Sequence, residues 1–444
     1  MIHAPAVLAS IAIAPAVAGG GWRMARRMTA DPARVLVGRS PGEAARLAPL
    51  IFNLCGAAHA RAAAAALGLP AERDAPAQAA ARERARDHAR AMLVDWPQAL
   101  GAAPDRASLG LLARPDGAPA LARALAGDAG ELCAFSPAEL DAWLAAGETE
   151  TVRLLARLRH ETDPAFGRAG LPLLTPQVLA TMIDTSPDAP PPPLWGRDGV
   201  GGEAASASLA ALTSSGATPP TLPSPARGEG ARGDQPDGAD ARHPEPGARG
   251  PLPLAGEGWE GERASSARAP READAGAGPL PISPPGPLPI SPPQAGEGDL
   301  ICAGQPALHF ETGALARLAG TPLCRALLAA EGPTLFARLI ARLADCLLAL
   351  AGAPEPELPA PAGVGLAYAA RGLLAHGARL QAGRVAAYRV VSPSAWNLAP
   401  GGLLERALAT LPAGAEGARL APLLVSAVNP CVPVAFLPAE AAHA

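Results

Sequence analysis

The chain has 444 residues and a formal net charge of −4, with 49% hydrophobic and 18% charged residues. This length and apolar content suffice for one large core or two ordinary ones, so we expect a folded globular protein. The charges are of mixed sign and form no basic face, which argues against nucleic acid and a membrane surface as partners. No apolar stretch reaches the roughly 20 residues that a membrane-spanning helix needs.

The six cysteines are widely spaced and form no CxxC pair. This pattern argues against a disulfide framework and a zinc knuckle, so we expect reduced thiols and a cytoplasmic location. Four of the cysteines lie in apolar or linker-edge contexts, where packing or incidental thiols are expected: Cys133, Cys302, Cys324 and Cys346.

The first part of the chain predicts a hairpin followed by helices. Apolar and β-branched runs flank the turn Gly19-Gly20-Gly21 within residues 7–30, which predicts the hairpin. The segment Ser40-Pro41-Gly42-Glu43 combines an N-cap serine with Pro at the first helical position and Glu at the third, so it predicts a helix start. Apolar recurrence at three and four residues predicts further helices at 55–67, 77–94, 119–125, 137–146 and 149–158.

Residues 187–299 predict a disordered insert. They are rich in Pro, Gly, Ser, Ala and Arg without apolar periodicity, and GPLPISPP at 278–285 repeats at 286–293. A repetitive insertion or flexible linker is favoured over a proline-rich docking segment. The insert then divides one domain into an N-terminal part, 1–186, and a C-terminal part, 300–444.

The C-terminal part predicts helices at 314–330 and 333–351, then strands at 365–374, 379–381 and 384–391. A short helix at 402–409 precedes an apolar run at 421–426 that brings Asn429-Pro430-Cys431 to a turn. The predicted fold class is mainly α with a small antiparallel β-sheet (α+β).

Cys55 and His59 are four residues apart at a predicted helix start, so their side chains face the same way. A thiolate beside an imidazole suits a soft metal or a nucleophile, although the two residues alone fit core packing on an Ala-rich helix better.

Five short segments, in order along the chain, resemble motifs of the nickel-iron hydrogenase large subunits. FNLCGAAH at 52–59 resembles the first metal motif, a CxxC followed by His, and ETGALAR at 311–317 is similar to E-x-G-P-L-A-R. AARG at 369–372 resembles the end of E-A-P-R-G, VSPSAWN at 391–397 resembles V-V-P-T-T-W-N, and NPC at 429–431 resembles the start of D-P-C-x-x-C. The resemblance implies a large-subunit-like fold.

The departures from these motifs concern the metal ligands. Cys55 and Cys431 match two of the family's four cysteines, whereas Phe52 and Val434 replace the other two. Phe and Val offer no donor atom, so we expect no nickel and no enzymatic activity.

The remaining matches fit the iron half of the family's metal centre, whose cyanide ligands accept hydrogen bonds. By resemblance, Arg371 and Ser394 would donate those bonds, Cys55 and Cys431 would bind iron, and His59 would donate to sulfur. The alternative is that Arg371 is a solvated turn residue and that Ser394 merely forms a turn.

The chain resembles the HupK type of accessory protein, a paralogue of the large subunit. This implies a scaffold or chaperone in hydrogenase maturation that holds an iron-dicyano-carbonyl intermediate. The implied partners are a maturation chaperone of the HypC or HupF type and the immature large subunit. A metal-free mimic that only binds these partners stays open, and an active large subunit is less favoured.

Overall fold

The computed structural model describes residues 6–16, 21–70, 74–129, 131–183 and 309–437. All of them belong to one compact unit, which contains segments from both sides of the gap at 184–308. The predicted insert at 187–299 and Cys302 lie outside the described residues, so the insert's disorder stays a prediction. None of the described helices has the length and apolar character needed to cross a membrane.

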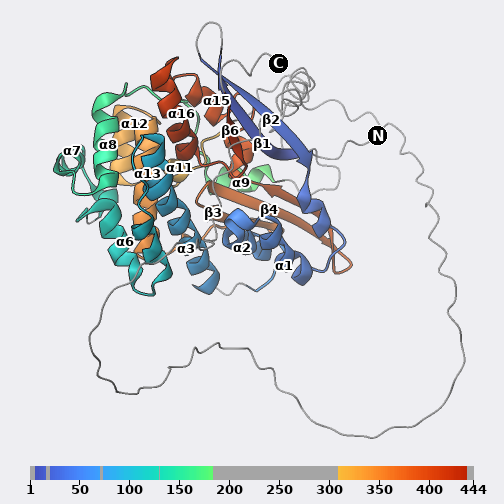
Figure 1. Ribbon diagram of the computed structural model, residues 1–444. Coiled ribbons are helices and arrows are strands. Elements are labelled where there is room, and N and C mark those ends of the chain that lie inside the picture. The colour runs from blue at the N-terminus through green and yellow to red at the C-terminus, as the bar shows by residue number, and fades with distance from the viewer. Residues whose placement is uncertain (1–5, 17–20, 71–73, 130, 184–308, 438–444) are drawn as a thin grey trace, which may run out of the picture. The chain divides into compact units, whose positions relative to one another are not determined.

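Helices dominate this unit, and strands form two small sheets (Figure 1). The helices are α1 (Pro41–Ile51), α2 (Gly56–Ala66), α3 (Asp74–Arg90), α4 (Trp96–Ala99), α5 (Arg106–Leu109), α6 (Gly117–Ala126), α7 (Pro137–Ala146), α8 (Glu150–Glu161), α9 (Pro176–Met182), α11 (Ala314–Leu318), α12 (Pro322–Ala330), α13 (Leu335–Leu350), α14 (Pro393–Asn397), α15 (Leu403–Leu408) and α16 (Ala415–Val428). The strands are β1 (Ala6–Pro15), β2 (Trp22–Ala30), β3 (Val364–Ala369), β4 (Gly372–Gln381), β5 (Arg384–Val391) and β6 (Val434–Phe436).

One sheet has the strand order β2-β1-β6 and the other the order β3-β4-β5. The predicted N-terminal hairpin is confirmed as the antiparallel pair β1 and β2, and β6 adds to β1 in parallel. The second sheet is fully antiparallel. The predicted fold class is confirmed, with the difference that there are two sheets and one of them is mixed.

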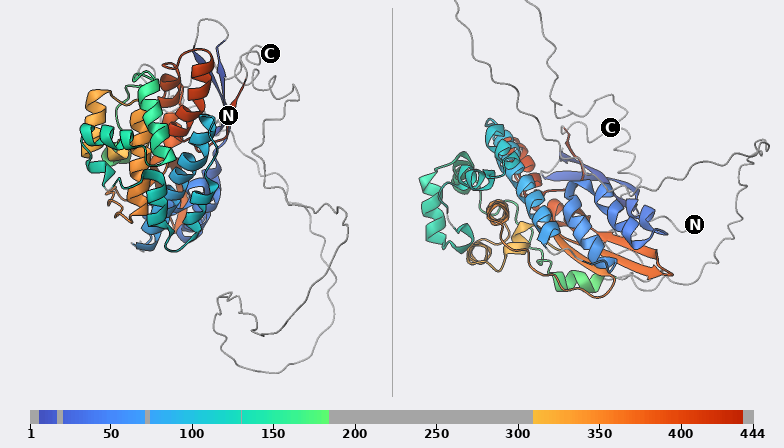
Figure 2. Two further views of the ribbon diagram at one scale, coloured as in Figure 1. Left: turned by 60° about the vertical axis from the view of Figure 1, so that its left-hand side comes forward. Right: turned by 90° about the horizontal axis from the view of Figure 1, so that it is seen from below.

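Helix α13 lies at the centre of the helical part and packs along α3 (Figures 1 and 2). Apolar side chains are buried around most of its circumference, including Leu335, Leu339 and Leu343. Such a helix is stable only when other elements surround it, and each fully buried leucine contributes about 1.5–3 kcal/mol. The main core therefore joins elements from both sides of the gap.

Small residues let α2 approach the β3-β4-β5 sheet closely. Helices α1 and α2 lie on one face of this sheet and α9 on the other, as Figure 2 shows from below. A Cβ added at Gly365 in β3 would lie 1.9 Å from the backbone oxygen of Ala62 and 2.7 Å from the nitrogen of Ala66. The alanines of α2 therefore serve a packing role that needs their small size.

Helix α3 passes through a π-helical turn, Ala91–Asp95, before it continues as α4. Pro97 has no N–H to donate to the carbonyl of Leu93, and that carbonyl instead accepts the N–H of Asp105 at 2.8 Å. The proline thus accounts for the irregular turn.

Several predicted elements are wrong in their boundaries. The helix predicted at 314–330 is broken, because Thr321 caps a new helix with Pro322 at its first position. The strands predicted at 365–374 and 379–381 are instead β3 and β4, which are joined by a tight turn at Ala370 and Arg371. The apolar run at 421–426 belongs to helix α16.

Candidate functional site

Helix α2 presents Cys55 and His59 to the sheet. Cys55 is the N-cap residue of α2 and packs against β3 and β4, with 5% of its surface exposed. His59 lies one turn further along and is also buried. Its ring stacks on Phe52, with ring centroids 4.5 Å apart and planes inclined by 18°.

Arg371 lies in the tight turn between β3 and β4 and is 7% exposed. Its Nη1 donates a long hydrogen bond, 3.4 Å, to the carbonyl oxygen of Leu54, the residue before Cys55. Its Nη2 lies 3.3 Å from the Asp87 carboxylate of α3. Its Nε is buried and has no hydrogen-bond partner among the described residues. Arg371 is therefore not a solvated turn residue.

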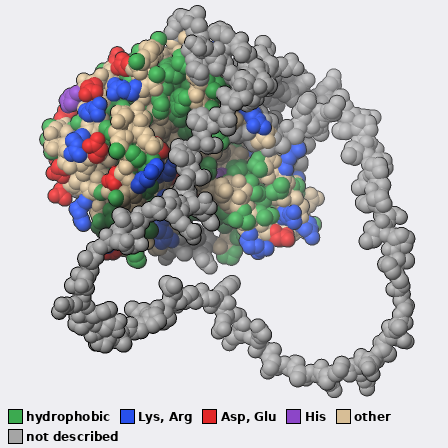
Figure 3. Space-filling view, viewed as in Figure 1, with side chains coloured by type: hydrophobic (Ala, Val, Ile, Leu, Met, Phe, Trp, Pro, Cys, Tyr) green, Lys and Arg blue, Asp and Glu red, His purple; other side chains and the backbone are tan. Residues whose placement is uncertain are grey.

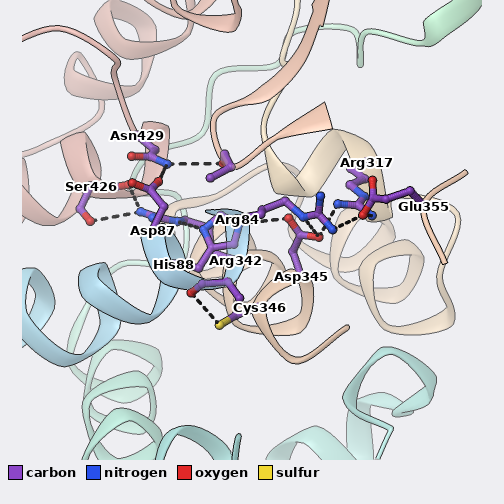
Figure 4. Close-up of polar contacts among 12 residues, drawn as sticks. Arg84, Asp87, His88, Arg317, Arg342, Asp345, Cys346, Glu355, Ser426 and Asn429 are labelled. Atoms are coloured by element: carbon purple, nitrogen blue, oxygen red, sulfur yellow. Dashed lines mark hydrogen bonds and ion pairs between the residues drawn. The ribbon is translucent and has the colours of Figure 1, made fainter. Parts of the chain in front are cut away.

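Asp87 links Arg371 to the end of α16. It accepts a hydrogen bond of 2.7 Å from Asn429 Nδ2, as Figure 4 shows. Asn429 ends α16 in the left-handed conformation, with φ of 56°, which Asn tolerates better than most residues. Burial opposes ionisation of Asp87, but Arg371, Arg342 and the Asn429 hydrogen bond outweigh it and hold the pKa of Asp87 below its usual value.

Cys431 follows this helix end and is half-buried. Its backbone N–H donates a hydrogen bond of 2.9 Å to the hydroxyl oxygen of Ser394, which is buried in α14. The Ser394 hydroxyl keeps its own hydrogen for donation. Ser394 therefore positions the Cys431 backbone as well as forming a helical turn.

The regions of the two cysteines, 376 positions apart in sequence, are linked by hydrogen bonds. Arg371 contacts Leu54 and Asp87, and Asp87 accepts a hydrogen bond from Asn429, two residues before Cys431. Burial raises the pKa of the Cys55 thiol to about 12, against the opposing effect of Arg371, and Cys431 is near enough to add to the rise. The structure thus brings together Cys55, Cys431, Arg371 and Ser394. His59 lies near Arg371, which together with burial lowers the pKa of His59 to about 3. The only hydrogen bond resolved for His59 within the described residues goes to His376, not to a sulfur.

A second polar network lies between α3 and α13 (Figure 4). Asp345 is buried between Arg84 and Arg317 and pairs with His88 at 3.0 Å. Burial opposes its ionisation, but Arg317, His88 and Arg84 hold the pKa of Asp345 far below its usual value. This network fixes α3 against α13 and thereby the position of Asp87.

The positions of the two missing cysteines are filled by apolar packing. Phe52 supports the His59 ring, and Val434 pairs with Ile11 in the sheet. Among the described residues, no group of three or more His, Cys, Asp or Glu side chains could hold a metal ion. This part of the structure thus offers two soft sulfur atoms and an unpaired guanidinium N–H.

The other cysteines within the described residues are set in packed surroundings. Cys324 and Cys346 are buried, and burial raises the pKa of both thiols. Cys133 is half-buried, and its pKa is raised to about 11, mainly by burial. Burial therefore keeps these thiols protonated, as it does the thiol of Cys55.

Sequence reasoning gave no role to Asp87, His376 or Tyr388. Asp87 stands in a charged stretch of α3 where its neighbours give no sign of burial. His376 lies on the same face of β4 as Leu374 and Ala378, so a strict alternation of faces could have placed it against α2.

Comparisons with known proteins find similarity to nickel-dependent hydrogenases in part of the chain. Residues 306–412 match the family model described as nickel-dependent hydrogenase. The Ni-Fe-Se hydrogenase of Desulfovibrio vulgaris Hildenborough aligns over 96% of this chain and 99% of its own, with a TM-score of 0.40 and 14% identity. Residues 306–412 are thus similar to the nickel-dependent hydrogenases, and this part of the chain holds three of the five motifs.

A more specific similarity is to the hydrogenase expression/formation protein HupK. The protein of Rhodobacter capsulatus is 40% identical over 171 residues, which are 38% of this chain and 53% of that protein. The HupK of Rhizobium leguminosarum bv. viciae is 34% identical over 152 residues, 30% of this chain and 40% of that protein. The predicted resemblance to HupK is confirmed, and the chain spans about half the length of these relatives.

Proposed function

We propose that the chain is a non-catalytic accessory protein of nickel-iron hydrogenase maturation. In this role it holds an iron-dicyano-carbonyl unit before the unit passes to the large subunit. The similarity to HupK supports the process, and the buried site supports the cargo.

The unpaired Nε–H of Arg371 carries this proposal. A buried donor without an acceptor costs about 1–3 kcal/mol, so a ligand that supplies an acceptor is favoured there. A cyanide ligand is such an acceptor, and the Ser394 hydroxyl could serve a second one. Cys55 and Cys431 would hold the iron, which needs fewer protein donors because it carries three diatomic ligands.

The surface beside Cys55 supports binding to other proteins. Leu50 and Leu54 are 71% and 52% exposed, at the end of α1 and in the turn before α2. A maturation chaperone of the HypC or HupF type and the immature large subunit are the proposed partners. The exposed leucines would equally serve a metal-free mimic, which is the second candidate function.

Infrared spectroscopy of protein purified anaerobically from a maturation-competent host separates the two candidates. We expect cyanide and carbonyl bands in the unaltered protein and their loss in Cys55→Ser and Cys431→Ser, because a hydroxyl is a harder donor than a thiolate. Cys133→Ser is the matched control and should keep the bands. Hydrogenase maturation in the host should fall in parallel, and less in Arg371→Lys, which keeps the charge but loses the planar fork.

Maturation that stays at the unaltered level in the double Cys55 and Cys431 variant would rule out metal handling and favour the mimic. The metal-free mimic would also be favoured by two results together: loss of maturation in the double variant Leu50→Ser and Leu54→Ser, and no cyanide or carbonyl bands in the unaltered protein or any variant.

A further inference from the structure

Three side chains form a continuous hydrogen-bonded line between α2 and the β3-β4-β5 sheet. His59 Nδ1 lies 2.7 Å from His376 Nε2, and His376 Nδ1 lies 2.6 Å from the Tyr388 hydroxyl. Both histidines are buried, with 2% and 0% of their surface exposed. Tyr388, on β5, is half-buried at the far end of the line. Of the three, only His59 has a role predicted from the sequence, as a donor to sulfur.

All three groups are uncharged in the folded protein near neutral pH. Burial lowers the pKa of His59 to about 3, and Arg371 adds to the effect. Burial also lowers the pKa of His376 well below its usual value and raises that of Tyr388. Each imidazole therefore carries one N–H, and the phenol keeps its proton.

The two hydrogen bonds must then run in the same direction. A neutral imidazole donates through one ring nitrogen and accepts through the other, so His376 cannot donate to both neighbours or accept from both. A phenol O–H is a stronger donor than a neutral imidazole N–H, and an imidazole nitrogen is the stronger acceptor. Tyr388 therefore donates to His376 Nδ1, and His376 Nε2–H donates to His59 Nδ1.

We propose that Tyr388 and His376 are positioning residues that fix His59 as its Nε2–H tautomer. Phe52 holds the same ring by its face, so both the plane and the protonation pattern of His59 are set from outside the cysteine site. His59 then has one remaining N–H, one helical turn from Cys55, to donate to a thiolate or another anionic acceptor. This last step rests on the proposed function, whereas the tautomer does not.

Partners of this kind matter at metal sites because they decide which ring nitrogen carries the proton. Where the histidine is itself a metal ligand, removing such a partner typically weakens metal binding about 10–100-fold. In the opposite tautomer, His59 would present a lone pair instead of an N–H and would repel an anionic acceptor. Through His376, the hydroxyl of Tyr388 on β5 therefore determines that His59 carries its proton on Nε2.

Nitrogen-15 spectroscopy of metal-free, anaerobic protein labelled at histidine tests the tautomer directly. The two neutral tautomers differ in which ring nitrogen shows the one-bond coupling to hydrogen, and the His59→Gln variant assigns the His59 signal. We expect the Nε2–H tautomer of His59 in the unaltered protein and a mixture of tautomers in Tyr388→Phe. Tyr368→Phe is the matched control, since Tyr368 is the only other tyrosine and lies over Arg317 instead.

A His59 proton on Nδ1 in the unaltered protein would overturn the inference. So would an unchanged His59 signal in a folded Tyr388→Phe. Because the measurement contains no iron, an absence of infrared bands would reject the proposed function and leave this result standing.

Discussion

At the scale of single residues, the site depends on an ion pair between Arg371, in the turn between β3 and β4, and Asp87 of α3. Four of the site residues could be predicted because each lies within one of the five motifs: Cys55, Cys431, Arg371 and Ser394. The partner of Arg371 could not be predicted, since Asp87 comes from α3, more than 280 positions away in sequence. The burial of a single Asp on a charged helix cannot be predicted until the elements that pack against it are known.

The Asp87 carboxylate should matter more than an exposed carboxylate in an ion pair. Asp87→Asn leaves Arg371 without its counter-ion, and we expect the free energy of unfolding to fall by about 2 kcal/mol. This is less than the roughly 3–5 kcal/mol of a fully buried pair, because Asp87 is partly exposed. Asp116→Asn, which breaks the exposed pair with Arg114, should change it by under about 0.5 kcal/mol. Denaturant unfolding of both variants measures the difference, and equal effects would contradict the buried role of Asp87.

At the scale of elements, periodicity predicted the long helices and failed where a turn interrupts an apolar run. The capping box at Ser40 was confirmed in full, because the motif is local and the structure contains both of its hydrogen bonds. The turn at Ala370 and Arg371 was missed, because apolar residues continue on both sides of it. Its backbone is set by Gly372, at φ of 124°, where a Cβ would lie 2.0 Å from the carbonyl oxygen of Thr312. Contacts with distant segments of this kind cannot be read from spacing.

The packing of α2 on β3 should be sensitive to a single methyl group. Gly365→Ala places a Cβ against backbone atoms of Ala62 and Ala66, which cannot move without shifting the helix that carries Cys55. We expect a loss of about 3 kcal/mol in unfolding free energy, at the upper end for overpacking. Gly320→Ala is the matched control, because nothing lies within 4 Å of the added Cβ there. A stability of Gly365→Ala equal to that of the control would mean that α2 and β3 are not in close contact.

At the scale of the whole molecule, the structure places an unusual set of ionisable side chains inside one core. Three histidines, His59, His88 and His376, are buried, and burial is the first cause that lowers the pKa of each. Composition did not predict this, because eight histidines in 444 residues give no sign of which are internal. The mixed signs of the surface could be predicted, and Figure 3 shows acidic and basic side chains interspersed over the helical part of one face.

These buried histidines predict how stability depends on pH. A histidine with a lowered pKa in the folded state is neutral there, whereas the unfolded chain binds a proton below pH of about 6.5. The full contribution of such a histidine to the free energy of unfolding is therefore present above a pH of about 6.5 and is lost as the pH falls. For His59 this loss continues down to a pH of about 3. Each such group contributes a slope of about 1.4 kcal/mol per pH unit, so the three together should destabilise the protein steeply on mild acidification. Asp87 and Asp345, whose pKa values are also lowered, lose their contribution only at more acidic pH.

Denaturant unfolding between pH 7.5 and 5, at about half-unit intervals, measures this slope, with the range chosen around the ordinary histidine pKa. His376→Gln should lower the slope by about 1.4 kcal/mol per pH unit, because one fewer proton is taken up on unfolding. Replacement of the exposed His160 by Gln should leave the slope of unfolding free energy against pH nearly unchanged. A flat stability profile below pH of about 6.5 would show that the three imidazoles are protonated in the folded state. The hydrogen-bonded line from Tyr388 to His59 would then lose its basis too, since a protonated imidazole donates through both nitrogens.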